Sequence, residues 1–552
     1  MLLTAQDVWS QASVEPGRVQ KQFEPPTVPH ATPDIVVPDI PSAIAPAEAS
    51  KVRVVLTAIV IDGASVYTTD HFEPLSKPLI GHEIALSEIF ALADAITTRY
   101  RHDDYILSRA VVPAQRLEKG VLHIQVVEGF INKVHFEGPV NDLLEQYGQR
   151  IVAEHPLRGA VLERYLLLMN DLPGLSARAV LAPATGSVGG SDLTLVTAQK
   201  KVDAYAGFDN HGTRYIGPLE ISSGVNANNA LGLGEKTSLN YATSRYTKQL
   251  KYVNIGEEMP FGSDGLLVTF HVGRSISKPG FLLSELEADA TGDMLGAKIS
   301  YPLQRSRADT LKVHAGFDFL NSATVMNGAP DISPSSNDHI RALRLGVTYD
   351  RADTFHGHNL FEMEVSRGLN MWGASRDDNA TLSRPNGRSD FEKLTLEASR
   401  RQELSQWVPN LGLYLAASAQ SSLGDNLLSS EQFGVGGSTF GRGYDPSEIT
   451  GDSGLSAKAE LQYSVNRDGV IDATQFYAFY DFGSTRNRQP DNKGAHEYSL
   501  ASTGAGVRFD ILNALSGDLV AAQPLTRLVA AEKLAGKENR PLAILFSLTA
   551  RY

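Results

Sequence analysis

The chain has 552 residues, more than one ordinary globular domain holds, so about two to four domains are expected. It contains no cysteine, which excludes disulfides, thiolate metal sites and cysteine nucleophiles. The formal net charge is −13 and no run of Lys and Arg would follow a phosphate backbone, so we expect no nucleic-acid partner.

Hydropathy does not distinguish a soluble chain from a membrane barrel. No stretch reaches the roughly 18 apolar residues of a membrane-spanning helix. A membrane barrel also has a low mean hydropathy, because only alternate residues of each strand face lipid. Residues 1–12 contain no basic residue and their apolar stretch is interrupted, so they do not match a secretory signal.

Residues 1–50 precede the first expected fold unit. Residues 24–50 carry seven prolines and no Lys or Arg, which predicts an extended, semi-rigid linker. Residues 14–23 are compatible with a short helix, since Pro16 is tolerated near a helix start.

Residues 51–200 favour two small α/β units. The first is expected to contain a strand, a helix and two closing strands: residues 52–60, 84–100, 107–112 and 121–127. The second is expected to contain a strand, two helices and two strands: residues 133–136, 141–153, 160–169, 177–181 and 193–196. The common β-α-α-β-β order suggests an internal repeat, and the alternative is one mixed α/β domain.

From residue 201 onward the helical period disappears. Segments of about ten residues alternate apolar and polar side chains between Gly, Asn and Asp turns, as in residues 455–463. We count roughly sixteen such segments, and closed barrels of bacterial outer membranes have an even number of strands. The chain also ends on an aromatic residue, Tyr552, inside the last segment. A transmembrane β-barrel is therefore favoured over a soluble β-sandwich.

The three zones together resemble the outer-membrane transporters of two-partner secretion (TpsB proteins), which are related to the barrel-assembly insertases. Residues 91–131 look like the helix and closing strands of the family's first POTRA domain, and residues 169–183 look like part of its second. Residues 209–213 resemble the first hairpin of the family's barrel.

The resemblance implies a mainly β architecture with the following divisions: a segment that forms a plug helix in some members (1–23), the linker (24–50), two POTRA domains (51–128 and 129–200) and an antiparallel barrel (201–552) with an inward-folding loop at about 423–453.

Two barrel motifs carry the most specific part of the resemblance. The first resembles the signature of the family's inward-folding loop: Phe440, Gly441, Arg442, Gly443 and Tyr444. The second resembles the FxDxG signature of a neighbouring strand, with Phe479, Asp481 and Gly483. The family usually has Val or Leu where this chain has Gly441, a departure that we expect to loosen the loop tip.

Strand alternation independently supports a pairing between these motifs. It places Phe476 and Tyr480 towards lipid and therefore Asp481 in the lumen, where Glu460 of the preceding strand also points. A guanidinium–carboxylate pair is bidentate, so Arg442 could hold the loop at one register. In a water-filled lumen such a pair should contribute about 1 kcal/mol. Without the resemblance, Arg442 would be assigned to an ordinary Gly-rich surface loop.

The family's activity implies export of one large partner, a β-helical adhesin or cytolysin, through a barrel that sits in outer-membrane lipid. The POTRA domains would face the periplasm and bind the unfolded client by β-augmentation, in which an extended chain adds to a strand edge. The candidate edge in the first unit consists of Leu107, Ser108, Arg109, Ala110, Val111 and Val112.

Two other functions remain open, an insertase for other barrels and a pore for small solutes. Insertases typically carry more POTRA repeats than the two expected here, and a simple pore has no use for periplasmic protein-binding domains. The sequence has no GxSxG, no HExxH and no acid/base pair at a strand end, so we expect no enzyme activity, no metal and no cofactor.

Overall fold

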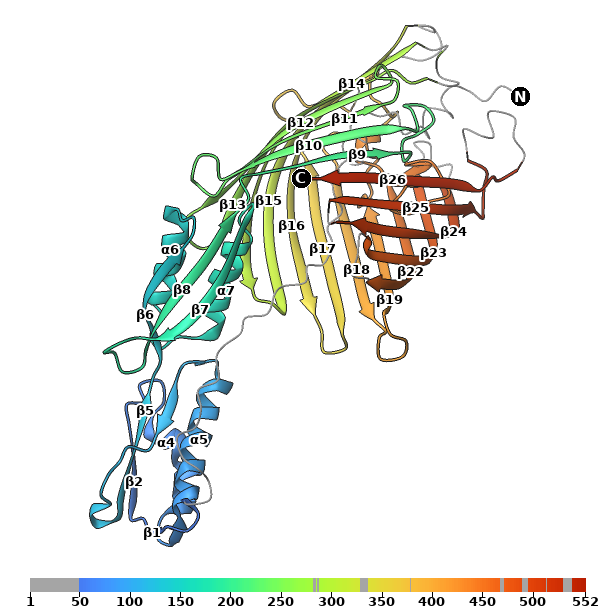
Figure 1. The fold of residues 1–552 in the computed structure, drawn as a ribbon. Helices are drawn as coiled ribbons and strands as arrows, with labels where there is room; N and C mark the ends of the chain where they lie inside the picture. The colour runs from blue at the N-terminus through green and yellow to red at the C-terminus, as the bar shows by residue number, and fades with distance from the viewer. Residues whose placement is uncertain are drawn as a thin grey trace.

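Two small α/β units and a large β-barrel make up the described part of the chain (Figure 1). The structure, a computed structural model, describes residues 49–280, 284, 287–327, 336–377, 379–466, 471–488, 495–512, 514–529 and 539–552. The candidate plug segment (1–23) and the linker up to residue 48 lie outside these residues. Within them, no helix combines the length and the apolarity that crossing a membrane requires.

The first unit packs two helices on a three-stranded sheet in the order β2-β5-β4, beside a two-stranded sheet of β1 and β3. Its elements are β1 (Arg53–Val55), β2 (Ala58–Asp62), α4 (Thr69–Ser76), η1 (Lys77–Leu79), β3 (Glu83–Ala85), α5 (Leu86–His102), β4 (Arg109–Val111), η2 (Glu118–Gly120) and β5 (Val121–Val127).

The single strand that we predicted for residues 52–60 is wrong, because the chain bends in its middle. Leu56 turns into the core, where it is fully buried, and the Thr57 N–H donates to the Gly120 carbonyl at 2.8 Å. The two halves therefore join different sheets, as β1 and β2. The predicted helix begins at Leu86 rather than at residue 84, because residues 83–85 pair with β1. The residues predicted for its apolar face are buried: Ile89, Leu92, Ala93 and Ile96.

The second unit repeats this plan with a sheet in the order β6-β8-β7. Its elements are β6 (Phe130–Glu137), α6 (Asp142–Val152), α7 (Gly159–Asn170), β7 (Leu175–Pro183) and β8 (Gly190–Gln199). In both three-stranded sheets the first strand, β2 or β6, is parallel to the last, and the last is antiparallel to the one before it. The common topology confirms the predicted internal repeat.

The two units are joined through the first turn of α7. The Asp104 carbonyl accepts from Gly159 N at 2.8 Å, and its carboxylate accepts from Ala160 N at 2.6 Å. Asp104 of the first unit thereby caps a helix of the second, whose own N-cap residue, Arg158, makes no capping hydrogen bond with its side chain. Ile106 and Leu107 pack against the core of the second unit, so the junction is both capped and apolar.

The barrel is closed and antiparallel, and the described residues contribute 16 strands to it, which confirms the predicted strand number. The strands are β9 (Val202–Asp209), β10 (Glu220–Asn228), β11 (Lys236–Ser244), β12 (Leu250–Phe261), β13 (Leu266–Ser277), β14 (Ala288–Arg305), β15 (Asp309–Met326), β16 (Ser336–Ala352), β17 (Gly357–Gly368), β18 (Glu392–Glu403), β19 (Leu411–Ser421), β22 (Ser453–Asn466), β23 (Ile471–Arg488), β24 (Ala495–Ile511), β25 (Leu515–Pro524) and β26 (Ala543–Arg551). β26 pairs with β9 and closes the barrel.

Apolar residues cover the outside of the barrel wall. Along β23, Phe476 and Tyr480 are 53% and 50% exposed on the outer face, whereas the alternate residue Asp481 is fully buried inside. This arrangement suits a wall between lipid and a polar lumen, as the alternation in the sequence predicts.

The second α/β unit lies against the barrel end that carries the short turns after β12 and β14 (Figure 1). Arg305, the last residue of β14, forms a bidentate ion pair with Asp171 at the end of α7, with contacts of 2.8 and 2.7 Å. Arg164 of α7 donates to the carbonyls of Asp264 and Pro302. The long segment between β19 and β22 therefore starts and ends at the opposite end of the barrel.

Candidate functional site: a loop held inside the barrel

Residues 422–452, which we call the inward loop, connect β19 to β22 and enter the lumen. The loop contains η4 (Ser429–Glu431) and a small sheet of β20 (Phe433–Val435) and β21 (Ile449–Gly451). Together with the strands β9, β10, β13–β19 and β22–β24, it lines a cavity of about 1630 Å³. Any large molecule that passes through the barrel has to displace this loop.

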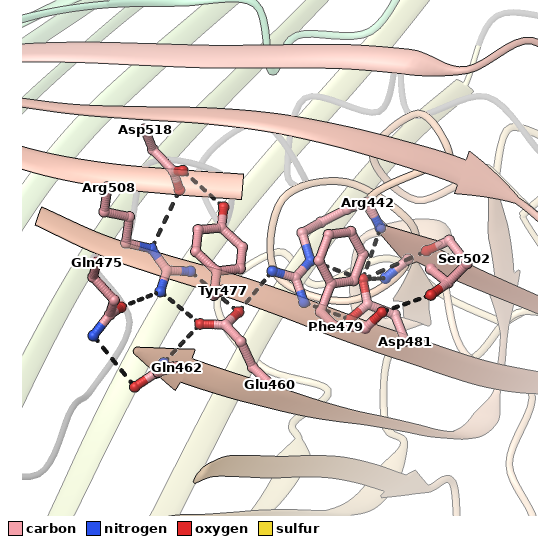
Figure 2. A network of polar contacts seen from close by, with 12 residues as sticks. Arg442, Glu460, Gln462, Gln475, Tyr477, Phe479, Asp481, Ser502, Arg508 and Asp518 are labelled. Carbon is pink, nitrogen blue, oxygen red and sulfur yellow. Dashed lines mark hydrogen bonds and ion pairs between the residues drawn. The ribbon is translucent and has the colours of Figure 1, made fainter. Parts of the chain in front are cut away.

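Arg442 near the loop tip is held by two carboxylates of the barrel wall (Figure 2). Its Nη2 and Nε donate to the two oxygens of Asp481 at 2.8 and 3.0 Å. Its Nη1 donates to Glu460 Oε2 at 2.8 Å. We call these three residues the latch; they join the loop to β22 and β23.

Backbone bonds and an aromatic ring complete the seat of Arg442. The backbone N–H groups of Gly441 and Arg442 donate to Asp481 Oδ2 at 3.1 and 3.0 Å, so the same carboxylate binds both main chain and side chain. The guanidinium lies 3.4 Å from the centre of the Phe479 ring, a cation–π distance. A lysine could occupy this site but could not form the same fork of bonds.

A second arginine extends the network along the wall. Arg508 of β24 donates to both oxygens of Glu460, at 2.5 and 3.1 Å, and lies 3.9 Å from the centre of the Tyr477 ring. Glu460 is thus shared between Arg442 and Arg508, and Figure 2 shows it between the two guanidinium groups. Our sequence analysis missed Arg508 and Tyr477, which belong to neither motif. Alternation alone could have placed Arg508 in the lumen, because its neighbours Val507 and Phe509 are apolar.

The glycines of both motifs permit close backbone approach. Gly441 has φ +86°, and a Cβ there would lie 2.8 Å from the side chain of Leu500. A Cβ on Gly443 would lie 2.9 Å from Pro524 N, and one on Gly483 would lie 2.3 Å from Val435 of β20. The expectation that Gly441 loosens the loop tip stays a prediction. The structure gives another reason for glycine at this position, since the backbone there adopts a conformation that favours glycine.

The two aromatic residues of the loop motif pack in the same apolar cluster as Val435 and Leu500. The Tyr444 hydroxyl lies 3.2 Å from the Ala501 carbonyl and 3.1 Å from Thr526 Oγ1, which joins the loop to β24 and to the segment just after β25. Phe440 lies under the Lys458 ammonium, 5.3 Å from Nζ to the ring centre. All nine residues that we predicted for the latch region therefore meet in one place: Phe440, Gly441, Arg442, Gly443, Tyr444, Glu460, Phe479, Asp481 and Gly483.

Burial changes the energy that we assigned to the latch. The side chains of Arg442, Glu460 and Asp481 are 5%, 2% and 0% exposed. The value of about 1 kcal/mol applies to a solvated pair, and this pair is not solvated. Removing one partner of a buried ion pair typically costs about 3–5 kcal/mol, because the other charge stays buried without compensation.

The predicted client edge at residues 107–112 is shorter than expected. Only Arg109–Val111 form a strand, β4, which lies at one edge of its sheet. Leu107 packs against the second unit, and Ser108 is buried with its hydroxyl accepting from Gly129 N. The Ala110 N–H, which points away from β5, already donates to Thr97 Oγ1 of α5 at 2.9 Å. A client strand would find few free bonding groups along β4.

The corresponding edge of the second unit is longer and more open. In β7 the outward groups of Ala177 are bonded to the Asn170 side chain, at 3.0 Å each. Two residues further on, Ala179 and Leu181 point the same way, since every second residue of an antiparallel strand faces outward. Among the described residues, no hydrogen bond occupies these outward groups. The neighbouring side chain of Val180 is 54% exposed.

Comparison with known families identifies this architecture. The sequence profile of the haemolysin secretion/activation proteins ShlB/FhaC/HecB matches residues 189–509, more than half of the chain. The chain belongs to this family. The profile of the ShlB-type POTRA domain matches residues 54–129, the first α/β unit. The protein is therefore an outer-membrane transporter of two-partner secretion, as its sequence motifs predict, and its POTRA domains face the periplasm.

Relatives and solved structures agree with this assignment. The heme/hemopexin transporter protein HuxB of Haemophilus influenzae (strain 86-028NP) is 23% identical over 472 residues, which cover 83% of this chain and 81% of HuxB. The outer membrane transporter CdiB of Dickeya dadantii (strain 3937) is 26% identical over 428 residues, covering 74% and 72%.

Two solved structures share the fold at lower identity. CdiB from Escherichia coli superposes with a TM-score of 0.74 at 20% identity, covering 95% of this chain and 94% of that structure. BamA from Haemophilus ducreyi, lacking POTRA domains 1–3, has a TM-score of 0.52 at 12% identity, covering 91% and 100%.

Proposed function

We propose that this transporter exports one large partner exoprotein, of the β-helical adhesin or cytolysin type, through its barrel. The POTRA domains bind the client in an unfolded state, and the client then threads the lumen when the inward loop leaves its seat. The names of the relatives support a specific cargo, since HuxB is named for heme/hemopexin. No nucleotide is required, because folding of the client outside the cell can make its movement directional.

The latch is the observation that carries this proposal. A loop that starts at the outer end of the barrel is tied, through Arg442, to carboxylates deep in β22 and β23. A passive pore gains nothing from a buried bidentate bond across its own channel. A transporter needs a channel that stays closed at rest and opens for a client, and a latch of a few polar bonds is suited to this purpose.

The test is export by an Arg442→Ala variant. The transporter is expressed in a Gram-negative host beside the exoprotein encoded next to it, and secreted client is measured. Export should fall sharply while the barrel still assembles, judged by heat-modifiable migration in gels. Arg401→Ala is the matched control, because Arg401 lines the same cavity from β18. Normal export by Arg442→Ala would overturn the role of the latch.

The other two functions give different results in the same cells. If client stays in the periplasm while unrelated barrels assemble better, the chain acts as an insertase. If neither client export nor barrel assembly depends on the chain, but small solutes enter faster, it acts as a pore.

We propose that the client adds to the edge of β7, and that β4 contributes less. The outward backbone groups of Ala179 and Leu181 can bond an extended chain without regard to its sequence. Val180 beside them offers an apolar contact to alternate side chains of the client. In the first POTRA domain the equivalent N–H groups are already bonded, that of Ala110 on β4 to Thr97 Oγ1 and that of Ser108 just before β4 to the Tyr105 carbonyl.

Photo-crosslinking distinguishes these two edges. A photoreactive residue placed at Val180 should capture the client in cells during export, because this side chain is exposed on the open edge. The same residue at Arg109, exposed on β4, is the matched control and should capture little. Stronger capture from position 109 would assign client binding to the edge of the first POTRA domain, as the sequence alone predicts.

A further inference from the structure

A second buried carboxylate holds the inward loop, on a part of the wall that the latch does not touch. Glu431, the last residue of η4, has a side chain that is 2% exposed. Its Oε1 lies 2.8 Å from Arg344 Nη2, and its Oε2 lies 2.5 Å from Lys393 Nζ. Here the loop supplies the carboxylate and the barrel wall supplies the cations, whereas in the latch the loop supplies the cation and the wall supplies the carboxylates.

The backbone of Glu431 is fixed as well as its side chain. Its carbonyl accepts from Lys393 Nζ at 3.3 Å and from Gln420 Nε2 at 3.0 Å. The same Gln420 amide also donates to the Asp452 carbonyl at the end of the loop, at 3.1 Å. Glu431 is therefore bound by residues of three strands, β16, β18 and β19.

The cations at this site differ in how much they depend on Glu431. Arg344 also binds Asp318 at 2.6 Å and Ser366 at 2.9 Å, so it keeps partners without the loop. Lys393 is 4% exposed, and Glu431 is the carboxylate that it contacts most closely. Departure of the loop would remove from Lys393 the carboxylate that it contacts most closely, which disfavours departure.

We propose that Glu431 is a second anchor, which holds the base of the inward loop independently of the Arg442 latch at its tip. This inference rests on the proposed function, since an anchor matters only if the loop must move. The two sites bind different strands, and β20 lies between them in the sequence. The tip can therefore leave β22 and β23 while the base stays on β16 and β18, which makes opening a two-step process.

Cysteine labelling can observe the two steps separately, because the chain contains no cysteine of its own. Ser430→Cys reports on the base and Val435→Cys on the tip, since each native side chain is 1% exposed. The assembled transporter in membranes is treated with a maleimide, and the rate of labelling is measured at each position.

The inference predicts opposite patterns in two variants. Glu431→Gln should raise labelling at position 430 by roughly tenfold or more, about 1.4 kcal/mol of lost closure, and leave position 435 protected. Arg442→Ala should raise labelling at position 435 and leave position 430 protected. Glu362→Gln is the matched control, because Glu362 also lines the cavity but bonds to Thr348 of the wall.

A second variant tests the same ion pair in case Glu431→Gln misfolds. Lys393→Met removes the cation from the wall and leaves the loop sequence intact, so it should expose position 430 in the same way. The inference is overturned if neither Glu431→Gln nor Lys393→Met exposes position 430, or if they expose both positions equally. If Arg442→Ala exposes neither position, the latch fails while the result for Glu431 stands.

Discussion

At position 441 the backbone conformation decides which residue fits. Gly441 has φ +86°, and its N–H bonds to the same carboxylate oxygen that receives Arg442. A side chain there would have to adopt a left-handed conformation and would meet Leu500. The family's usual Val or Leu therefore cannot be transferred to this chain without strain.

We predict that Gly441→Ala weakens the seat of the loop tip. Left-handed strain should cost about 1–3 kcal/mol, and the contact with Leu500 adds to it. The measurement is maleimide labelling of Val435→Cys, which should rise. Gly316→Ala is the control, since Gly316 lies in β15 and the nearest atom to its added Cβ would be 3.5 Å away. Unchanged labelling in Gly441→Ala would mean that the tip tolerates the strain.

Single residues were predictable where a short motif named them. Arg442 and Asp481 each lie in a contiguous motif, and alternation along β23 placed Asp481 in the lumen. Arg508 and Glu431 were not found, because their partners are 48 and 87 residues away and no local pattern joins them. Burial of the latch was also beyond the sequence, since it depends on how the loop and three strands pack together.

In the first POTRA domain one carboxylate joins elements that are distant in the sequence. Glu128, just after β5, accepts from Ser65 N at 2.8 Å, Val66 N at 3.1 Å and the Tyr100 hydroxyl of α5 at 2.8 Å. Burial alone would raise the pKa of Glu128, but these hydrogen bonds outweigh it and the pKa lies below its usual value. Burial also raises the pKa of Tyr100, which stays a neutral donor.

We predict that acid weakens this domain through Glu128. A carboxyl whose pKa is lowered by folding stabilises the fold above its unfolded pKa, and the stabilisation is lost as pH falls through the lowered value. Glu128→Gln should lose about 1–3 kcal/mol at pH 7 and should lose less than the wild type on acidification. The measurement is urea unfolding followed by helical circular dichroism, because the described α-helices all lie in the POTRA domains.

The control for this prediction is Asp94→Asn, on the exposed face of α5. Its unfolding curve should follow that of the wild type at each pH. Equal sensitivity of Glu128→Gln and the wild type to acid would assign the acid response to other carboxylates.

At the level of elements, the sequence predicted the order of helices and strands better than the residues at which each begins and ends. The second POTRA domain follows the predicted β-α-α-β-β order, because apolar periodicity is a local property. The first departs from it, since its first strand is divided into β1 and β2 and the short strand β3 lies between its two α-helices. The strand at residues 52–60 was predicted unbroken, since no residue close to it in the sequence indicates that Leu56 turns into a core built from α4 and α5. The strand at residues 107–112 was overextended for a similar reason, because its first residues serve the junction with the second domain.

At the level of the whole molecule, the second POTRA domain is joined to the barrel by an apolar contact and by ion pairs. Leu168 of α7 lies against Gly265 and Pro302, where an added Cβ on Gly265 would approach Leu168 to 2.7 Å. Beside this apolar contact stand the bidentate pair of Arg305 with Asp171 and the more exposed pair of Arg150 with Asp264. The strand number followed from alternation, but this docking could not, because it joins residues that are distant in the sequence.

We predict that Arg305→Gln lets the POTRA domains swing on the barrel. The Arg305 side chain is 13% exposed and its pair is bidentate, so its loss should cost about 1 kcal/mol or more of docking. Spin labels on Gln149→Cys of α6 and Gln406→Cys, in the turn after β18, should then give a broader distance distribution. Client export should fall with it, because a client released by β7 would meet the lumen less often.

Arg150→Gln separates a specific hinge from general loss of charge. Arg150 lies at the same junction, but its contact with Asp264 is 3.4 Å long and both side chains are 50% exposed. An exposed pair of this kind contributes little, so the distance distribution should stay narrow. If both variants broaden the distance distribution equally, both ion pairs contribute to holding the domains on the barrel. If neither does, the remaining contacts hold them, the apolar one of Leu168 and the bonds from Arg164, and the Arg305 pair is dispensable for docking.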